Sequence, residues 1–186
     1  SYLEAVRATP LVRELLGGRL ALEWTRARVV HDDPAKTLDT ADRKDLLLFP
    51  ELVRTMGRPE KTFDLISPYF VPGDQGTASL AQLAGSGVKV RVLTNSLASS
   101  EAGVVFAGYA KRRHDLLRAG VQLYEMKPTG VRPPREEREE KAGIGSSGSS
   151  ALHAKTFAVD RGRIFVGSFN FDLRSALLNT EMGLVI

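Results

Sequence analysis

Hydrophobic and polar residues alternate along the chain in rhythms that predict strands and helices. Lys61–Ser67 and Val88–Thr94 predict two strands, and in the second the apolar residues occupy every other position. Between them Asp74–Ala84 has helical character and ends at the turn Gly85-Ser86-Gly87. Strand, helix, glycine turn and strand in this order indicate a βαβ unit with parallel strands, which favours the α/β class.

The same rhythms continue on both sides of this unit. Val104–Ala119 predicts a second long helix, which closes at Gly120 and leads into a strand over Val121–Glu125. We expect four further elements: short helices within residues 1–16, a strand within Arg19–His31, a helix over Asp42–Met56 with a kink or a second start at Pro50, and a final strand over Glu181–Ile186.

The composition changes between Lys127 and Ser150 to Pro, Gly, Ser and mixed charge. Such a stretch does not carry enough apolar surface to form a packed element. It predicts a flexible loop over residues 128–150, inside a single domain of 186 residues rather than between two domains. Because the loop leads directly into the next strand, we expect it to act as a lid or gate.

Composition excludes several classes of protein. Hydrophobic residues make up 42% and charged residues 26%, which is ordinary for a soluble globular chain. There is no cysteine, which excludes disulfides and cysteine metal sites, and no apolar run approaches the roughly 18 residues of a transmembrane helix. The net charge of +4 is compatible with anionic lipid or nucleic acid and does not choose between them.

The chemistry concentrates in the stretch from Leu152 to Asn170. His153 and Lys155 are two residues apart in a predicted strand, so they project from the same face about 7 Å apart along the backbone. Asp160-Arg161-Gly162 is a turn-forming cluster that predicts a hairpin. The fold-back would return Ser168 and Asn170 toward the start of the first strand.

This set of side chains suits a phosphate better than a carbonyl. Lysine neutralises anionic oxygens, an asparagine amide donates hydrogen bonds, and neutral histidine can attack phosphorus to form a phosphohistidine. Such an attack requires the proton to be fixed on the other ring nitrogen, usually by a carboxylate or carbonyl partner. Glu181 is the candidate for that partner.

At this point the sequence resembles the phospholipase D superfamily. The residues that match its HKD motif are His153, Lys155, Asp160, Gly167, Ser168 and Asn170, with Glu181 where that family places its histidine-orienting glutamate. Segments such as Ser67–Pro72 and Leu93–Leu97 look like the C-terminal half of bacterial cardiolipin synthases, so the resemblance covers roughly residues 20 to 186. It implies an α-β-α sandwich, with a mixed, mostly parallel sheet flanked by helices on both faces.

The resemblance also implies a role for each residue. His153 would be the nucleophile or the general acid, Lys155 and Asn170 would bind phosphate oxygens, and Ser168 would support phosphate binding by hydrogen bonding. Glu181 would fix the imidazole, and Asp160 and Gly167 would be structural. No metal and no cofactor are implied.

Family members of this kind carry two HKD motifs, whereas this chain has one. With the missing initiator methionine, this indicates a C-terminal half that is nearly inactive by itself. We expect its mate to be an N-terminal HKD half or a second copy in a homodimer.

The implied activity is phosphodiester exchange through a phosphohistidine, most simply cardiolipin synthesis from a phospholipid such as phosphatidylglycerol. The fragment itself would be soluble and act in the bacterial cytoplasm, peripheral to the inner membrane, and nucleic acid is not an expected partner. Two alternatives stay open: a homodimeric phosphodiesterase or nuclease of the same superfamily, and a non-catalytic lipid-binding half.

Several other residues allow two interpretations. His31-Asp32-Asp33 fits a metal site or, more commonly, a polar turn, and the basic Lys111–Arg113 fits a solvated helix face or a phosphate contact. Tyr69 and Phe70 would line a substrate wall or simply pack their loop. Arg174 would contact a phosphate or, with slightly more weight, brace the Asn170 loop through Asp172.

Overall fold

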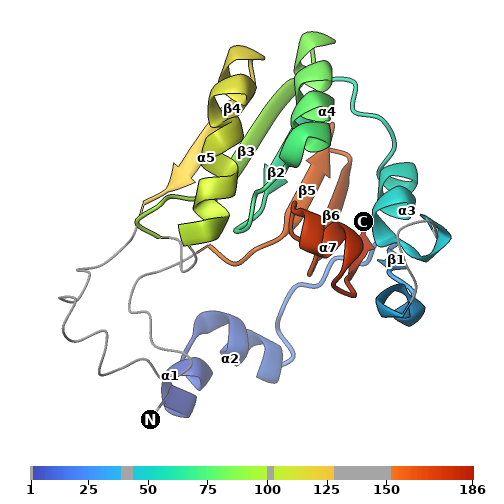
Figure 1. Cartoon of the computed structure of the whole chain (residues 1–186). Coiled ribbons are helices and arrows are strands. Elements are labelled where there is room, and N and C mark those ends of the chain that lie inside the picture. The colour runs from blue at the N-terminus through green and yellow to red at the C-terminus, as the bar shows by residue number, and fades with distance from the viewer. Residues whose placement is uncertain (1, 39–43, 100–102, 128–151) are drawn as a thin grey trace.

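The computed structural model of the chain describes residues 2–38, 44–99, 103–127 and 152–186 (Figure 1). The loop predicted over residues 128–150 lies outside this described part. No helix within it is long and apolar enough to cross a membrane.

The elements follow one another largely as the sequence predicts. The helices are α1 (Tyr2–Arg7), α2 (Pro10–Leu16), η1 (Pro34–Thr37), η2 (Lys44–Leu46), α3 (Leu48–Met56), α4 (Gly73–Gly85), α5 (Gly103–Arg118) and α7 (Leu173–Leu177), where η1 and η2 are 3-10 helices. The strands are β1 (Arg28–His31), β2 (Thr62–Ile66), β3 (Lys89–Asn95), β4 (Gln122–Met126), β5 (Thr156–Val159), β6 (Arg163–Gly167) and β7 (Met182–Val185).

Two predicted elements are shorter than expected. The strand expected within Arg19–His31 is confined to β1, because its partner β7 offers only four residues for pairing. The helix expected over Asp42–Met56 begins only at Leu48, after the separate η2. Pro50 therefore marks a second start and not a kink, since it lies in the first helical turn, where the missing N–H removes no intrahelical hydrogen bond.

The seven strands form one mixed sheet in the order β1-β7-β6-β5-β2-β3-β4. The α/β class and the mixed sheet are confirmed. The expectation of a mostly parallel sheet is wrong, because only β2-β3 and β3-β4 pair in parallel, whereas the other four pairings are antiparallel. The reason is that helices α4 and α5 connect the parallel strands, whereas a tight turn connects β5 to β6 and β7 returns beside β6.

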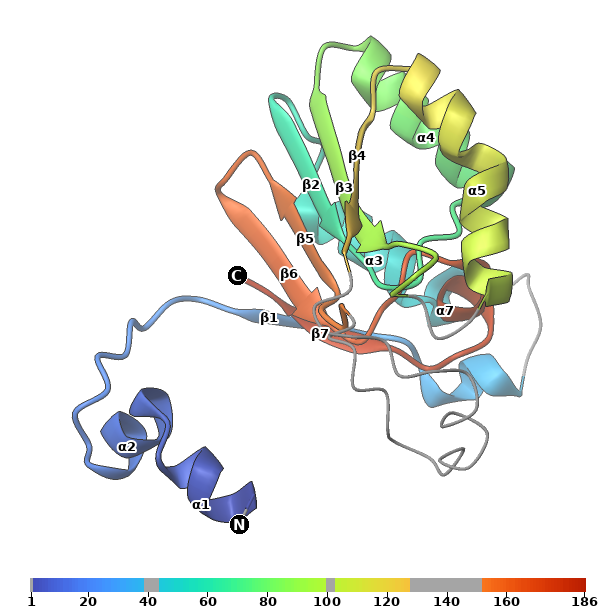
Figure 2. The same ribbon diagram turned by 90° about the vertical axis from the view of Figure 1, so that its left-hand side faces the viewer.

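The core lies on one face of the sheet, which α3, α4, α5 and α7 cover (Figure 2). Alternate strand residues point into it, and those that are buried are Val30, Leu65, Val90, Val92, Phe157, Val159, Phe165 and Val185. From the helices, Leu48, Leu52, Leu80, Tyr109 and Leu116 meet them. This alternation follows from the two-residue period of a strand.

The opposite face carries no helix among the described residues, so the expected helices on both faces are not found there. Its exposed apolar side chains, each 37–59% exposed, are Val29, Ile164, Val166, Met182, Leu184 and Ile186. We call this set the open sheet face. On β2 and β3 the same side bears an ion pair in which Arg91 Nη2 lies 2.7 Å from Asp64 Oδ2, and this pairing raises the pKa of Arg91.

Candidate active site

The predicted hairpin is present and carries the candidate chemistry. Asp160 and Arg161 both have positive φ, 52° and 56°, and the Gly162 amide donates to the Val159 carbonyl at 3.0 Å. Val159 pairs with Arg163, so the chain reverses over the three residues between them and joins two antiparallel strands. Beyond the paired strands the Gly167 amide still donates to the Lys155 carbonyl at 3.2 Å, so both ends of the motif lie together.

His153 and Lys155 meet, although the strand predicted to carry them begins only at Thr156 and both residues precede it. Lys155 Nζ lies 3.4 Å from His153 Nε2 and donates to the His153 carbonyl at 2.8 Å. His153 is exposed, whereas Lys155 is half-buried. Burial lowers the pKa of Lys155, and the negative charge of Glu181 acts in the opposite direction. A cation is thus held beside the imidazole at the surface.

Residues from other strands fix the position of this segment. Thr156 pairs with Ile66 at the carboxyl end of β2, and the Asn95 side chain at the carboxyl end of β3 makes two hydrogen bonds to the Leu152 backbone, at 3.0 and 3.2 Å. His153 therefore lies just beyond the ends of the parallel strands, where open α/β sheets bind ligands. The sequence alone did not predict that Asn95 would bind the Leu152 backbone, although a polar residue at the end of a predicted strand is a candidate for the ligand edge of the sheet.

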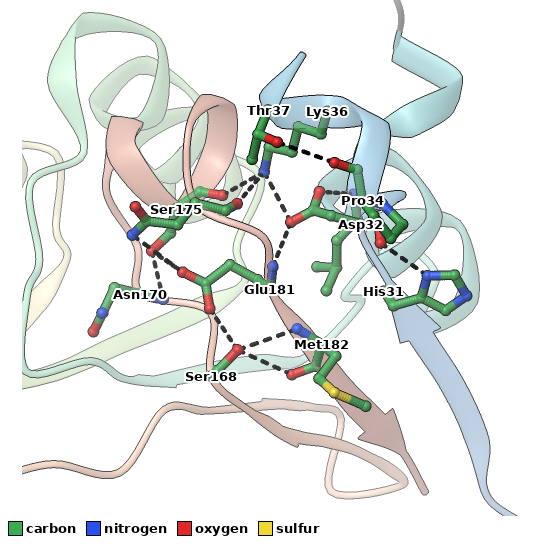
Figure 3. A network of polar contacts seen from close by, with 12 residues as sticks. His31, Asp32, Pro34, Lys36, Thr37, Ser168, Asn170, Ser175, Glu181 and Met182 are labelled. Atoms are coloured by element: carbon green, nitrogen blue, oxygen red, sulfur yellow. Dashed lines mark hydrogen bonds and ion pairs between the residues drawn. The ribbon is translucent and has the colours of Figure 1, made fainter. Parts of the chain in front are cut away.

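Glu181 is buried directly behind the motif, only 6% exposed. Its carboxylate accepts hydrogen bonds from the hydroxyls of Ser168 and Ser175, the latter at 2.8 Å (Figure 3). Among the hydrogen bonds of the described residues none joins Glu181 to His153, so its role in fixing the imidazole stays a prediction. Ser175 is a site residue that the sequence did not reveal.

Asn170 is joined to the same network through its backbone. Its amide donates to Ser175 Oγ at 3.3 Å, while its side-chain Oδ1 is buried without a hydrogen-bond partner within the described residues. The intervening Phe169 is buried and stacks on Phe49 with ring centroids 5.6 Å apart. Phe169 therefore anchors the segment that carries Ser168 and Asn170 to the core.

Gly167 allows a close approach of two strands. A Cβ at this position would overlap the Met182 carbonyl oxygen and would lie 2.8 Å from Gly183 Cα. Any side chain would therefore push β7 from β6 and move Ser168 away from Glu181.

Asp160 lies at the far end of the hairpin, away from the imidazole. Its carboxylate accepts hydrogen bonds from three consecutive backbone amides, those of Glu60, Lys61 and Thr62, at 2.7–2.9 Å. These bonds, that from Thr62 first, lower the pKa of Asp160. The contacts are those of a residue that braces the turn against the start of β2.

The Asp160→Asn variant is expected to unfold more easily at neutral pH and to lose this disadvantage in acid. The folded-state pKa of Asp160 is lowered, so its contribution to stability is complete above the unfolded-state pKa and is lost as pH falls through the folded-state value. Urea denaturation at neutral and acid pH measures the difference. The matched control is Asp115→Asn at an exposed site on α5; equal effects of both variants at every pH would contradict the bracing role.

The remaining candidates are resolved by their contacts. Asp32 pairs with Lys36, and Asp33 caps η1 by accepting from the Ala35 amide at 2.8 Å. No cluster of three or more metal-ligating side chains is found within the described ranges. His31-Asp32-Asp33 therefore follows the polar interpretation, although Asp32 is buried.

The basic helix face is largely paired. Arg112 forms an ion pair with Asp74, and Arg113 contacts Glu125 at 3.1 Å, which leaves Lys111 exposed. These pairs agree with a structural helix surface.

The loop after β2 and the loop after β6 are joined to each other. Phe70 is buried against Tyr109 and Phe171, which agrees with the packing interpretation, whereas Tyr69 is half-buried.

Arg174 was expected to contact a phosphate or to brace the Asn170 loop through Asp172. Asp172 instead caps α7 by accepting from the Ser175 amide at 2.7 Å, and no ion pair between Asp172 and Arg174 is found in the described part.

The geometry now permits comparison with known proteins. A family model described as "Cardiolipin synthase, PLD-like domain" matches residues 52–186. The chain belongs to the phospholipase D-like family. This phospholipase D-like domain is 48% identical over 186 residues to cardiolipin synthase C of Escherichia coli (strain K12). The match covers 100% of this chain and 38% of that protein.

Solved structures show the same fold at low identity. Phosphatidylserine synthase of Haemophilus influenzae Rd KW20 matches with a TM-score of 0.55 and 15% identity, over 86% of this chain and 34% of that one. The phospholipase D family member Nuc of Salmonella typhimurium matches with a TM-score of 0.52 and 14% identity, over 87% and 82% of the two chains. At these identities the comparison establishes the fold of the phospholipase D-like domain and no more.

Proposed function

We propose that this chain provides one half of the active site of a phosphatidyltransferase that makes cardiolipin. The observation that carries the proposal is the Lys155 Nζ atom 3.4 Å from His153 Nε2, on a segment held by Asn95. A cation beside an exposed imidazole suits nucleophilic or acid-base work on an anionic phosphodiester. The similarity to cardiolipin synthase C supports this choice of lipid.

The proposed reaction exchanges one alcohol for another at phosphorus. One histidine attacks the phosphorus of phosphatidylglycerol, a P–N bond forms, and the P–O bond to glycerol breaks. A second histidine gives a proton to the leaving glycerol oxygen. It then takes the proton from a hydroxyl of a second phosphatidylglycerol, whose oxygen attacks phosphorus, breaks the P–N bond and yields cardiolipin.

The residues of this chain would divide this work as follows. His153 is the nucleophile or the general acid, and Lys155 and Asn170 bind the non-bridging phosphate oxygens, which the lysine also neutralises. Ser168 would support the phosphate site, and its hydroxyl is held by a hydrogen bond to the Glu181 carboxylate. Glu181 would also fix the imidazole of His153. Asp160 and Gly167 keep the hairpin in place.

A single His153 cannot perform both halves of the exchange. We propose that an N-terminal HKD half, or the same domain in a homodimer, supplies the second histidine. Two facts support a missing mate: the chain spans 38% of the length of its similar relative, and the open sheet face is apolar and 37–59% exposed. The complete enzyme would act at the cytoplasmic surface of the bacterial inner membrane, where its lipid substrates lie.

Vesicles of phosphatidylglycerol test this function with the complete protein. We expect cardiolipin and free glycerol to appear in equal amounts, which mass spectrometry and an enzymatic glycerol assay measure. Phosphatidic acid without cardiolipin would contradict a transferase. Cleavage of DNA without any lipid reaction would favour the nuclease alternative, and vesicle binding with no reaction would favour the non-catalytic one.

A further inference from the structure

An ion pair is buried behind the candidate active site, between Asp32 and Lys36 (Figure 3). The two residues are only 2% and 4% exposed, and Lys36 Nζ lies 2.8 Å from Asp32 Oδ2. They stand at the end of β1 and in η1, well before the motif in sequence. Charged side chains are almost never this buried unless they have a specific set of partners.

Lys36 uses all three ammonium donors within the fold. Besides Asp32, it donates to the Ser175 carbonyl at 2.9 Å and to the Asn179 carbonyl at 2.8 Å. These carbonyls lie in and just after α7, near the end of the short helix. Lys36 therefore fixes the segment that presents the Ser175 hydroxyl to the Glu181 carboxylate.

Asp32 binds the backbone of Glu181 on both sides. Its Oδ2 accepts from the Glu181 amide at 2.8 Å, and its own amide donates to the Glu181 carbonyl at 2.8 Å. Its Oδ1 accepts from the Leu48 amide at 2.6 Å, so the carboxylate is fully paired. The two hydrogen bonds with Asp32 fix the backbone of Glu181, whose side chain points toward Ser168.

We propose that Asp32 and Lys36 are positioning residues for the active site, acting through Glu181 and Ser175; this inference rests on the function proposed above. Replacing a buried ion pair by apolar residues is often neutral or stabilising, so stability alone is a weak account of this pair. Its hydrogen bonds converge instead on the two residues that hold Ser168 and Asn170. Lys36 also balances the charge of Asp32 next to a second buried carboxylate.

The test compares Lys36→Met, Asp32→Asn and the double variant in the complete protein. Misplacing a site by about 1 Å costs about 10²-fold in rate, so we expect each single variant to lose about 10²-fold in kcat with KM unchanged. Because both residues act through one network, the double variant should lose far less than the product of the two single losses.

The matched control is Leu116→Ala, which weakens the core on α5 without touching the network. It should lower the urea midpoint as much as Lys36→Met or more and keep wild-type kcat in the folded protein. If Lys36→Met also keeps wild-type kcat when folded, the pair is merely structural and the proposal is overturned.

Two further measurements separate this proposal from the proposed function. Hydrolysis of bis(p-nitrophenyl) phosphate reports on the site even if cardiolipin is not the product, and the same loss of kcat is expected there. A crystal structure of Lys36→Met needs no substrate at all: the Glu181 carboxylate should leave the Ser168 hydroxyl. An unchanged hydrogen bond between them would overturn the proposal, whatever the reaction is.

Discussion

His153→Ala should abolish phosphodiester exchange by the complete protein, with a rate loss of at least about 10³-fold. Acid-base catalysis alone contributes about 10² to 10⁴ in rate, and a nucleophile that is missing cannot be replaced by a neighbour. The side chain is exposed, so its removal leaves no cavity and the protein should stay folded. Formation of cardiolipin from phosphatidylglycerol, followed by mass spectrometry, measures the loss.

The chain offers a matched control for this variant. His114 is an exposed histidine on α5 and lies outside the motif. The same substitution there, His114→Ala, should keep wild-type activity. An active His153→Ala protein would contradict the catalytic role and favour a non-catalytic, lipid-binding half.

Lys155→Met should lower kcat by about 10² to 10³-fold, the cost of removing one preorganised group that stabilises charge in the transition state. The lysine stands 3.4 Å from the imidazole and is half-buried, so water does not screen its charge as it does at the surface. Lys111→Met is the matched control, because Lys111 is an exposed lysine on α5. Equal kcat in the two variants would contradict the role of Lys155.

The same residue predicts a pH dependence. Burial lowers the pKa of Lys155, so the ammonium is lost at a lower pH than in an ordinary lysine. Since the charged form binds phosphate, wild-type activity should fall as pH rises through this lowered pKa. In Lys155→Arg, whose guanidinium stays protonated above pH ~12, the fall should move to higher pH. An identical basic limb in both proteins would show that another group titrates.

The hairpin could be predicted from the sequence because its determinants are local. The turn residues lie between two apolar runs, and the two-residue period alone places His153 and Lys155 on one side. In the structure both residues precede β5, yet their side chains meet, and Asp160 is bonded to three amides at the start of β2. Residues close in sequence were therefore enough to find the centre of the site.

The support behind the site could not be predicted in the same way. Lys36 and Ser175 are 139 positions apart, and Asp32 and Glu181 are 149 apart, so no local pattern links them. In sequence Asp32 belongs to a polar turn, and only the fold shows that the pairing of β1 with β7 carries it to Glu181. This β1-β7 pairing also adds one of the four antiparallel pairings of the sheet.

The open sheet face departs from the expectation of helices on both faces of the sheet. The run Met182-Gly183-Leu184-Val185 has no polar residue, which in sequence is typical of a strand covered on both faces. In the fold Met182 and Leu184 lie on the uncovered side with Val166, and we propose that they meet the second half of the enzyme.

Stereochemistry at phosphorus distinguishes a phosphohistidine intermediate from direct displacement. The complete protein would be given a phosphatidylglycerol whose phosphorus is chiral through isotopic oxygen or sulfur substitution, together with an acceptor alcohol. Each in-line displacement inverts phosphorus, so a phosphohistidine intermediate, which requires two displacements, predicts overall retention of configuration. Inversion would mean a single direct displacement by the acceptor and would contradict the nucleophilic histidine on which this account depends.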